Sequence, residues 1–213
     1  MMRLSFAVLA LGLLTACGAG GGSSTPDAPD SAIQAARYVP EGPPSVTLFT
    51  VVNNRSGSGA HSGLLISGSE QVLFDPAGSF RHPRLPERGD VHHGMNDRMV
   101  AFYIDYHARE TYRVIEQKIT VSPEVAELVM ARAKARGAVP QAHCANSISG
   151  ILNGVPGFES VGSTFFPNRL SDRFGKLPGV TTRVITDDDA DDNHGVLLID
   201  PVKVEPTLRI VQN

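Results

Sequence analysis

Runs of β-branched and apolar residues predict that much of this chain forms β-strands. The segment SVTLFTVV at residues 45–52 has the composition of a buried strand. Residues 60–78, AHSGLLISGSEQVLFDPAG, contain two such runs separated by a Ser-Gly-Ser segment, which predicts a β-hairpin. Residues 53–59 between these elements, NNRSGSG, are typical of a loop.

The two faces of the predicted hairpin indicate its register. With the loop at residues 67–69, Leu64 pairs with Val72, and His61 lies directly opposite Asp75 on the other face. A slip of one residue would mix apolar and polar side chains on both faces. In the preferred register, the face turned to the core carries four apolar side chains: Leu64, Ile66, Val72 and Phe74.

Further strands are predicted on both sides of a central helical region. Residues 98–108, RMVAFYIDYHA, and residues 111–121, TYRVIEQKITV, are rich in aromatic and β-branched residues and predict two strands. Near the C-terminus, residues 180–186, 195–200 and 202–211 predict short strands.

The helical region begins with a clear start signal. Ser122 suits the N-cap of a helix, Pro123 its first turn, and Gly137 its end, so we expect a helix over residues 122–137. Its expected buried stripe consists of Val125, Leu128 and Val129.

A second, shorter helix is predicted at residues 144–154, CANSISGILNG. Apolar residues recur there at intervals of three and four, and an Asn-Gly pair ends the pattern. Residues 165–177 predict one or two further helical turns, and the polar residues 79–97 predict a loop. These elements together indicate the α+β class, with an antiparallel sheet packed against the helix that begins at Cys144.

The N-terminus has the pattern of an export signal. One basic residue, Arg3, precedes an apolar run of about ten residues, which is too short to span a bilayer. Leu-Thr-Ala before Cys17 resembles a bacterial lipobox, which implies a signal peptide over residues 1–16 and lipidation of Cys17. The alternative is an ordinary signal peptide cleaved nearby. We therefore expect a protein anchored in the cell envelope, at the periplasmic face of the outer membrane in a Gram-negative bacterium.

Composition after the signal predicts one globular domain on a tether. Residues 17–44 include a Gly/Ser/Pro-rich stretch typical of a flexible linker, and residues 45–213 are long enough for one domain. Loss of Arg3 leaves 18 basic and 22 acidic residues, a net charge of −4. This mild acidity argues against nucleic acid as a partner, because that binding depends on clustered Lys and Arg.

The lipidation of Cys17 would leave Cys144 without a partner in the chain. An unpaired cysteine in an exported protein forms an intermolecular bridge, is buried and inert, or is reactive. A helix N-terminus lowers the pKa of a thiol, and the predicted cross-strand pair of His61 and Asp75 offers a base and a group that orients it. Each residue also has a structural interpretation: a buried thiol, a histidine at a strand start, and an Asp-Pro turn.

Two other polar segments suggest metal binding only weakly. His82, His92 and His93 lack the spacing of a known zinc motif, and residues 187–195, DDDADDNHG, lack the Gly and Glu of an EF-hand. A solvated loop explains the acidic segment better. We expect no metal and no cofactor. Tyr103 and Tyr106 are candidates for substrate contact or for packing.

Five short motifs lie within residues 45–180: HSGLLI, VLFDPAG, HCANSISGIL, PGF and FFP. Together they resemble the circularly permuted branch of the NlpC-like papain-fold superfamily. This branch includes lecithin–retinol-acyltransferase-like proteins and bacterial lipoproteins. The resemblance implies a permuted papain-like fold with Cys144 as nucleophile, His61 as base and Asp75 as third polar residue. Two features depart from the pattern: many relatives have His, Asn or Gln in place of Asp75, and a small polar residue in place of His143.

The resemblance also implies a class of reaction. We expect a thiol-dependent amidase or peptidase of the envelope that acts on peptidoglycan stem peptides or related amides. Three alternatives remain: a thioesterase or acyltransferase on lipid substrates, a non-catalytic binding lipoprotein, and a metal-binding lipoprotein that uses the histidine-rich loop. No sequence feature indicates an oligomeric state.

Overall fold

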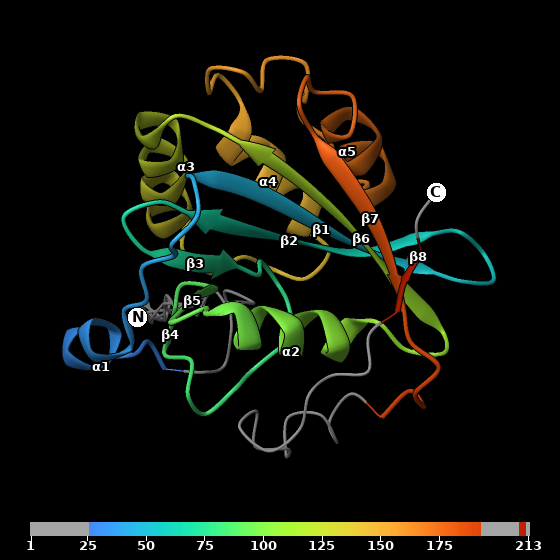
Figure 1. The fold of residues 1–213 in the computed structure, drawn as a ribbon, viewed down its shortest axis with the longest axis horizontal. Coiled ribbons are helices and arrows are strands. Elements are labelled where there is room, and N and C mark those ends of the chain that lie inside the picture. Colours follow the sequence, from blue (N-terminus) through green and yellow to red (C-terminus); the bar gives the residue numbers. More distant parts are fainter. Residues whose placement is uncertain (1–25, 193–208, 212–213) are drawn as a thin grey trace, which may run out of the picture.

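The computed structural model describes residues 26–192 and 209–211. It confirms the α+β class: one antiparallel sheet, in the strand order β4-β5-β3-β2-β1-β6-β7-β8, lies between helices (Figure 1). The strands are β1 (Ser45–Asn53), β2 (Gly59–Ser67), β3 (Gln71–Phe74), β4 (Glu87–Arg88), β5 (Val91–His93), β6 (Tyr112–Thr120), β7 (Thr181–Thr186) and β8 (Arg209–Val211). The helices are α1 (Asp30–Ala36), α2 (Asp97–His107), α3 (Pro123–Arg136), α4 (Cys144–Leu152) and α5 (Pro167–Phe174).

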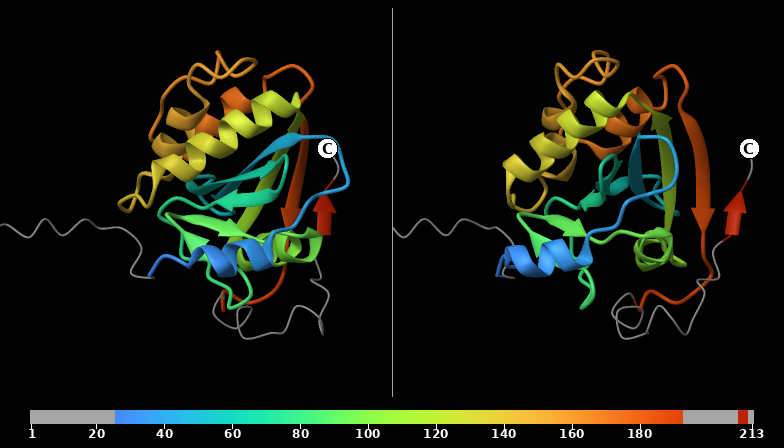
Figure 2. Two further views of the ribbon diagram at one scale, coloured as in Figure 1. Left: turned by 90° about the vertical axis from the view of Figure 1, so that its left-hand side faces the viewer. Right: turned by 60° about the vertical axis from the view of Figure 1, so that its left-hand side comes forward.

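Helices cover both faces of the sheet, so the domain has two hydrophobic cores (Figure 2). On one face, α3, α4 and α5 pack against the side chains of Leu48, Leu64 and Phe74. On the other face, α2 packs against Phe49 and Leu65. Because successive strand residues point to opposite faces, the central strands must be apolar at nearly every position. This explains the runs of apolar and β-branched residues that predicted β1 and the β2–β3 hairpin.

The predicted faces of the hairpin are confirmed, but the predicted register is wrong by two residues. Leu64 pairs with Phe74 instead of Val72, and the loop lies at residues 68–70, where the Gly68 N–H bonds to the carbonyl of Glu70. A shift of two residues keeps every side chain on its face, because the period of a strand is two. Asp75 consequently follows the end of β3 and lies diagonal to His61 instead of directly opposite it.

The prediction of a strand at residues 98–108 is wrong, because this segment forms α2. Asn96 caps the helix by accepting a hydrogen bond from the Met99 N–H, at 3.0 Å. Residues 102–107 are all buried, whereas Asp97 and Arg98 at the start of the helix are exposed. The aromatic and β-branched residues of this segment give it the composition of a buried strand.

The loop predicted at residues 79–97 contains two short strands, β4 and β5, which extend the sheet beyond β3. The segment before β1, expected within a tether over residues 17–44, includes α1 from Asp30. Its neighbour Ala28 donates its N–H to the carbonyl of Glu87, at 2.8 Å, and Arg88 forms an ion pair with Asp30. Within the described part, this segment therefore packs on the domain.

The other predicted elements compare well with the structure. Strands β1, β6 and β7 and helices α3, α4 and α5 are confirmed. The predicted strand at 195–200 and most of that at 202–211 lie outside the described residues, and β8 is the described end of the latter. In α3 the predicted stripe is rotated: Leu128 is exposed, and small residues let the helix approach the sheet through Ala126, Val129, Met130 and Ala133. None of the described helices combines the length and apolar character needed to cross a bilayer.

Candidate functional site

Cys144 is the first residue of α4, as the sequence predicts. The chain reverses sharply just before it: Ala142 has a φ of 64°, a left-handed conformation that is uncommon for a residue with a Cβ. The helix then runs beneath the sheet with Ala145 and Ile148 in the core. Cys144 forms no disulfide within the described part of the chain, and its side chain is only 6% exposed.

Burial alone would raise the pKa of the Cys144 thiol, but its polar neighbours outweigh this effect. A hydrogen bond and the charge of His61 lower the pKa, and the backbone N–H groups of Ser62 and Ala145 lower it further. The net pKa lies below the ordinary value for cysteine. A thiol in this environment carries its negative charge more readily than a free one, which is the property of a nucleophilic cysteine.

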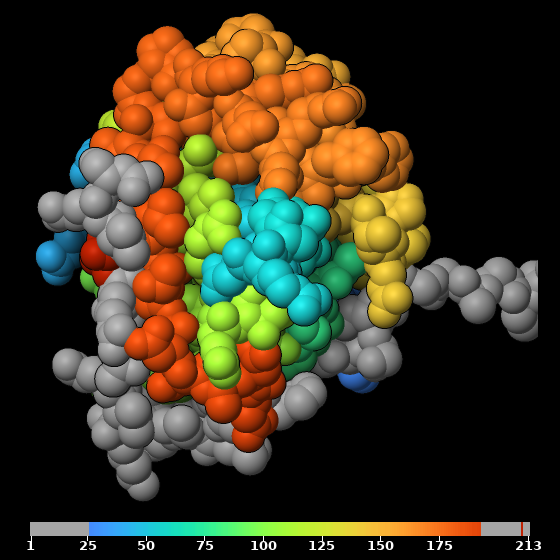
Figure 3. Space-filling view, turned by 90° about the vertical axis from the view of Figure 1, so that its right-hand side faces the viewer, coloured from blue at the N-terminus to red at the C-terminus, as the bar shows by residue number. Residues whose placement is uncertain are grey.

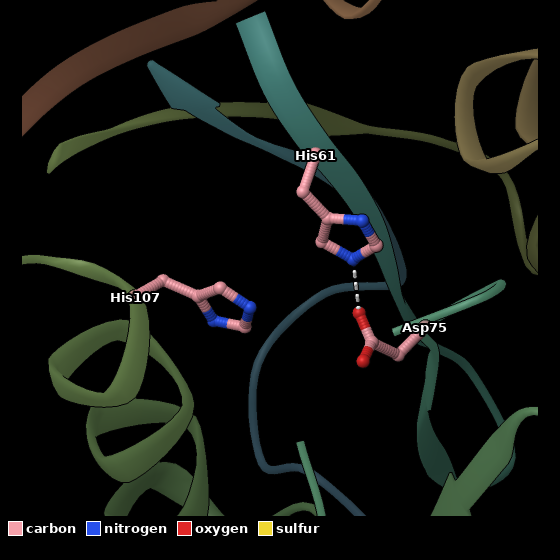
Figure 4. Close-up of side chains that lie close together, drawn as sticks. All are labelled: His61, Asp75 and His107. Atoms are coloured by element: carbon pink, nitrogen blue, oxygen red, sulfur yellow. Dashed lines mark hydrogen bonds and ion pairs between the residues drawn. The ribbon is translucent and has the colours of Figure 1, made fainter. Parts of the chain in front are cut away.

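His61 bridges Cys144 and Asp75. Its Nε2 lies 2.6 Å from Asp75 Oδ1, as Figure 4 shows, and this leaves Nδ1 for the hydrogen bond with the thiol. Burial by itself would lower the pKa of His61, but the charge and hydrogen bond of Asp75 and the contact with Cys144 raise it to about 10. Asp75 is 1% exposed; burial raises its pKa, yet the charge of His61 outweighs that and holds it well below its usual range.

The structure thus brings together all three residues that the sequence predicted for catalysis. They come from the start of β2, the residue after β3, and the start of α4. The sheet holds His61 and Asp75 on the face that α2 covers, whereas Cys144 belongs to the core under the other face. The site therefore forms near the first residues of β2, where α4 begins.

Tyr103 on α2 fixes the orientation of Asp75. Its hydroxyl donates a hydrogen bond to Asp75 Oδ1, at 2.8 Å, the same oxygen that binds His61. This close approach requires glycine at position 63, since a Cβ there would collide with the Tyr103 hydroxyl and lie 3.4 Å from Asp75 Oδ1. From the sequence, Tyr103 was expected only to contact substrate or to pack, because residues 98–108 were expected to form a strand.

His107 is a second histidine in the site that the sequence analysis missed. Its ring stacks on that of His61, with centroids 5.6 Å apart and planes 11° apart, and its Nδ1 donates to the carbonyl of Tyr103, at 2.9 Å. Burial lowers the pKa of His107 to about 4, so this imidazole is neutral at pH 7. The Asn96 cap and the four-residue spacing from Tyr103 to His107 were the available signals of a shared helix face.

A hollow of about 260 Å³ lies beside His61 and His107, with Ala77, Gly78 and Tyr106 among its walls. In Figure 3, the β1–β2 loop (cyan) lies on the surface between the segment that starts α4 (yellow) and the segment that leads into α5 (orange). Asn168 ties this loop to α5 by donating a hydrogen bond to the carbonyl of Gly57, at 2.8 Å.

The three histidines of residues 82–93 do not form a cluster of metal ligands in the described part of the chain. His93 Nδ1 lies 3.3 Å from Glu70 Oε2, and His92 is fully buried beside the ring of Phe80. The described residues bring two other groups together: His61 with Asp75 and His107, and a set of three acidic side chains near Arg109, namely Asp105, Asp187 and Asp189.

None of the protein-family models, curated proteins or solved structures compared with this chain matches it significantly. The function is therefore inferred from the site itself.

Proposed function

We propose that this protein is a thiol-dependent hydrolase, with Cys144 as nucleophile, His61 as general base and acid, and Asp75 as the residue that orients His61. The observation that supports this most strongly is the continuous set of contacts from the buried carboxylate through His61 to a thiol with a lowered pKa. The permuted NlpC-like arrangement of a histidine strand before a cysteine helix is part of the same proposal.

In the proposed reaction, the Cys144 thiolate attacks the carbonyl carbon of an amide. The protonated His61 gives its proton to the leaving amine, and a thioester remains on Cys144. Water then attacks the thioester while His61 takes its proton, which releases the acid and restores the Cys144 thiolate and the protonated His61. The backbone N–H of Cys144, at the positive end of α4, stabilises the negative oxygen in both steps.

The proposed substrates are stem peptides of peptidoglycan or related amides. The resemblance implies this class, and lipidation of Cys17 would keep the enzyme near them in the envelope. A second candidate is a thioesterase or acyltransferase on lipid substrates. It is favoured by Phe165 and Phe166, which are 55% and 62% exposed, because Phe165 contacts His143 next to the nucleophile and offers an apolar surface to an acyl chain.

Turnover of stem peptides and of acyl thioesters by the folded protein distinguishes these candidates. We expect Cys144→Ala to abolish turnover and His61→Ala to reduce it by about 10²–10⁴-fold, because that is the usual contribution of a general base. His143→Ala serves as the matched control for loss of a nearby histidine. Turnover that survives in Cys144→Ala would refute the proposal, and a reactive thiol without turnover would favour a non-catalytic binding protein.

The membrane anchor is tested separately. Cys17→Ser should abolish lipidation and move the protein from the detergent phase to the aqueous phase in detergent phase separation. A Cys17→Ser protein that stays in the detergent phase would show that Cys17 is not the attachment site. A wild-type protein already found in the aqueous phase would support an ordinary signal peptide.

A further inference from the structure

Three side chains of the site form a set of ligands that suits a transition metal. One ligand atom each from His61, Asp75 and His107 lies within 4.8 Å of the other two (Figure 4). Two imidazoles and one carboxylate are the protein ligands of many zinc sites, in which water or substrate occupies the fourth position. The nucleophilic role proposed for Cys144 makes no use of His107, so the catalytic arrangement does not explain this grouping.

His107 has the orientation of a metal ligand. Because a carbonyl oxygen only accepts hydrogen bonds, the bond to the Tyr103 carbonyl places the proton of a neutral His107 on Nδ1. The lone pair is then on Nε2, and Figure 4 shows the ring turned toward His61 and Asp75. Metal-bound histidines are typically held in this way, by a hydrogen bond from the other ring nitrogen.

Asp75 supplies the negative charge and has coordination capacity left. It is 1% exposed, and its Oδ2 has no hydrogen-bond partner among the described residues. Tyr103 holds its Oδ1, as outer groups commonly hold the carboxylates of metal sites. A buried carboxylate oxygen without a partner is costly, and a bound cation would remove that cost.

The site also has a route for entry and room for a fourth ligand. The hollow of about 260 Å³ is lined by both His61 and His107. It therefore gives access to both imidazoles, and a water molecule from it would complete a tetrahedral zinc site.

We propose that His61, Asp75 and His107 form a Zn²⁺ site that competes with the catalytic arrangement of the same residues. Zinc binds His61 Nε2, and the proton shared with Asp75 leaves to solvent. The 2.6 Å separation of Nε2 and Asp75 Oδ1 must then widen to about 3.3 Å, because the bonds to zinc are about 2.0–2.2 Å long and meet at a tetrahedral angle. Bound zinc thus withdraws His61 from its pairing with Asp75, and the metal acts as an inhibitor.

The test uses the full chain with Cys144→Ala, so that the thiol cannot bind the metal. We expect one equivalent of Zn²⁺ to bind in calorimetry, and Co²⁺ in its place to show the visible absorption of a four-coordinate site. Adding His107→Gln should weaken binding by more than about 100-fold, since even loss of an outer partner costs 10–100-fold. His143→Gln, which removes a histidine outside the cluster, should leave the affinity unchanged.

Two results would overturn the site: no stoichiometric binding to the Cys144→Ala protein, or equal affinity with His107→Gln and with His143→Gln. If His107→Gln does not fold, as judged by circular dichroism, Asp75→Asn takes its place and should also weaken binding strongly. Metal binding is measured without the nucleophile, so this result and the failure of the hydrolase proposal are independent of each other.

Discussion

Asp75→Asn is the substitution that tests the electrostatics of the site most directly. Asparagine keeps the size of the side chain and an oxygen that accepts hydrogen bonds from His61 and Tyr103, so the geometry is preserved while the charge is lost. Without that charge, protonated His61 becomes less stable, and the Cys144 thiolate loses its cationic partner. We expect the pH at which Cys144 becomes reactive to rise.

The structure sets the size of this effect. The bond from His61 to Asp75 is short, at 2.6 Å, and joins two charged groups, so it is expected to contribute about 1.5–3 kcal/mol. Since one pH unit corresponds to about 1.4 kcal/mol, the midpoint for alkylation should rise by about 1–2 units.

The assay measures the rate of alkylation by iodoacetamide from pH 4 to pH 9, with labelling at Cys144 verified by mass spectrometry. Asp172→Asn, which removes an exposed carboxylate on α5, is the control for the same chemical change elsewhere. Equal midpoints for the wild type and Asp75→Asn, in proteins with the same circular dichroism spectrum, would show that Asp75 does not act through His61.

Two further predictions concern stability, measured by urea unfolding in the presence of a chelator. Gly63→Ala should destabilise the fold by about 1–3 kcal/mol through its collision with Tyr103, whereas Gly150→Ala, in open space on α4, should be neutral or stabilising; equal effects would contradict the packing described. Stability should fall as the pH is lowered below about 6.5. There the unfolded chain takes up a proton that buried His107, with a pKa of about 4, does not, which costs up to about 3 kcal/mol. Stability that is constant or rises as the pH falls from about 6.5 to about 4.5 would refute this assignment. Above pH 6.5 two effects oppose each other, because folded His61 keeps a proton that the unfolded chain has lost, and folded Cys144, with its lowered pKa, has lost a proton that the unfolded chain keeps.

The catalytic candidates were predictable because their signals are local. Cys144 follows from the start of a periodic helix, and the His61 and Asp75 pair follows from the apolar faces of a hairpin. The hairpin register was wrong by two residues because the pattern of faces repeats every two residues and cannot distinguish such shifts. Only the turn at residues 68–70 decides between them.

The contributions of Tyr103 and His107 to the site were not predictable in this way. Tyr103 and His107 lie on a helix whose last six residues are all buried and rich in aromatic residues, so its composition resembles that of a strand. Their contribution depends on the long-range packing of α2 against the sheet, which composition and spacing do not encode. The start of that helix was marked by Asn96, and that local signal was outweighed by the aromatic and β-branched content of the segment.

The central position of β1 has a consequence for how the protein folds. The partners that β1 needs on its β6 side lie 59 to 75 residues further along the chain, from the Asn53–Tyr112 pair to the Ser45–Thr120 pair. Contacts this distant in sequence form slowly, because a long loop must close before any of them is gained. The amides of β1 should therefore be among the last to exchange with solvent, through global unfolding alone.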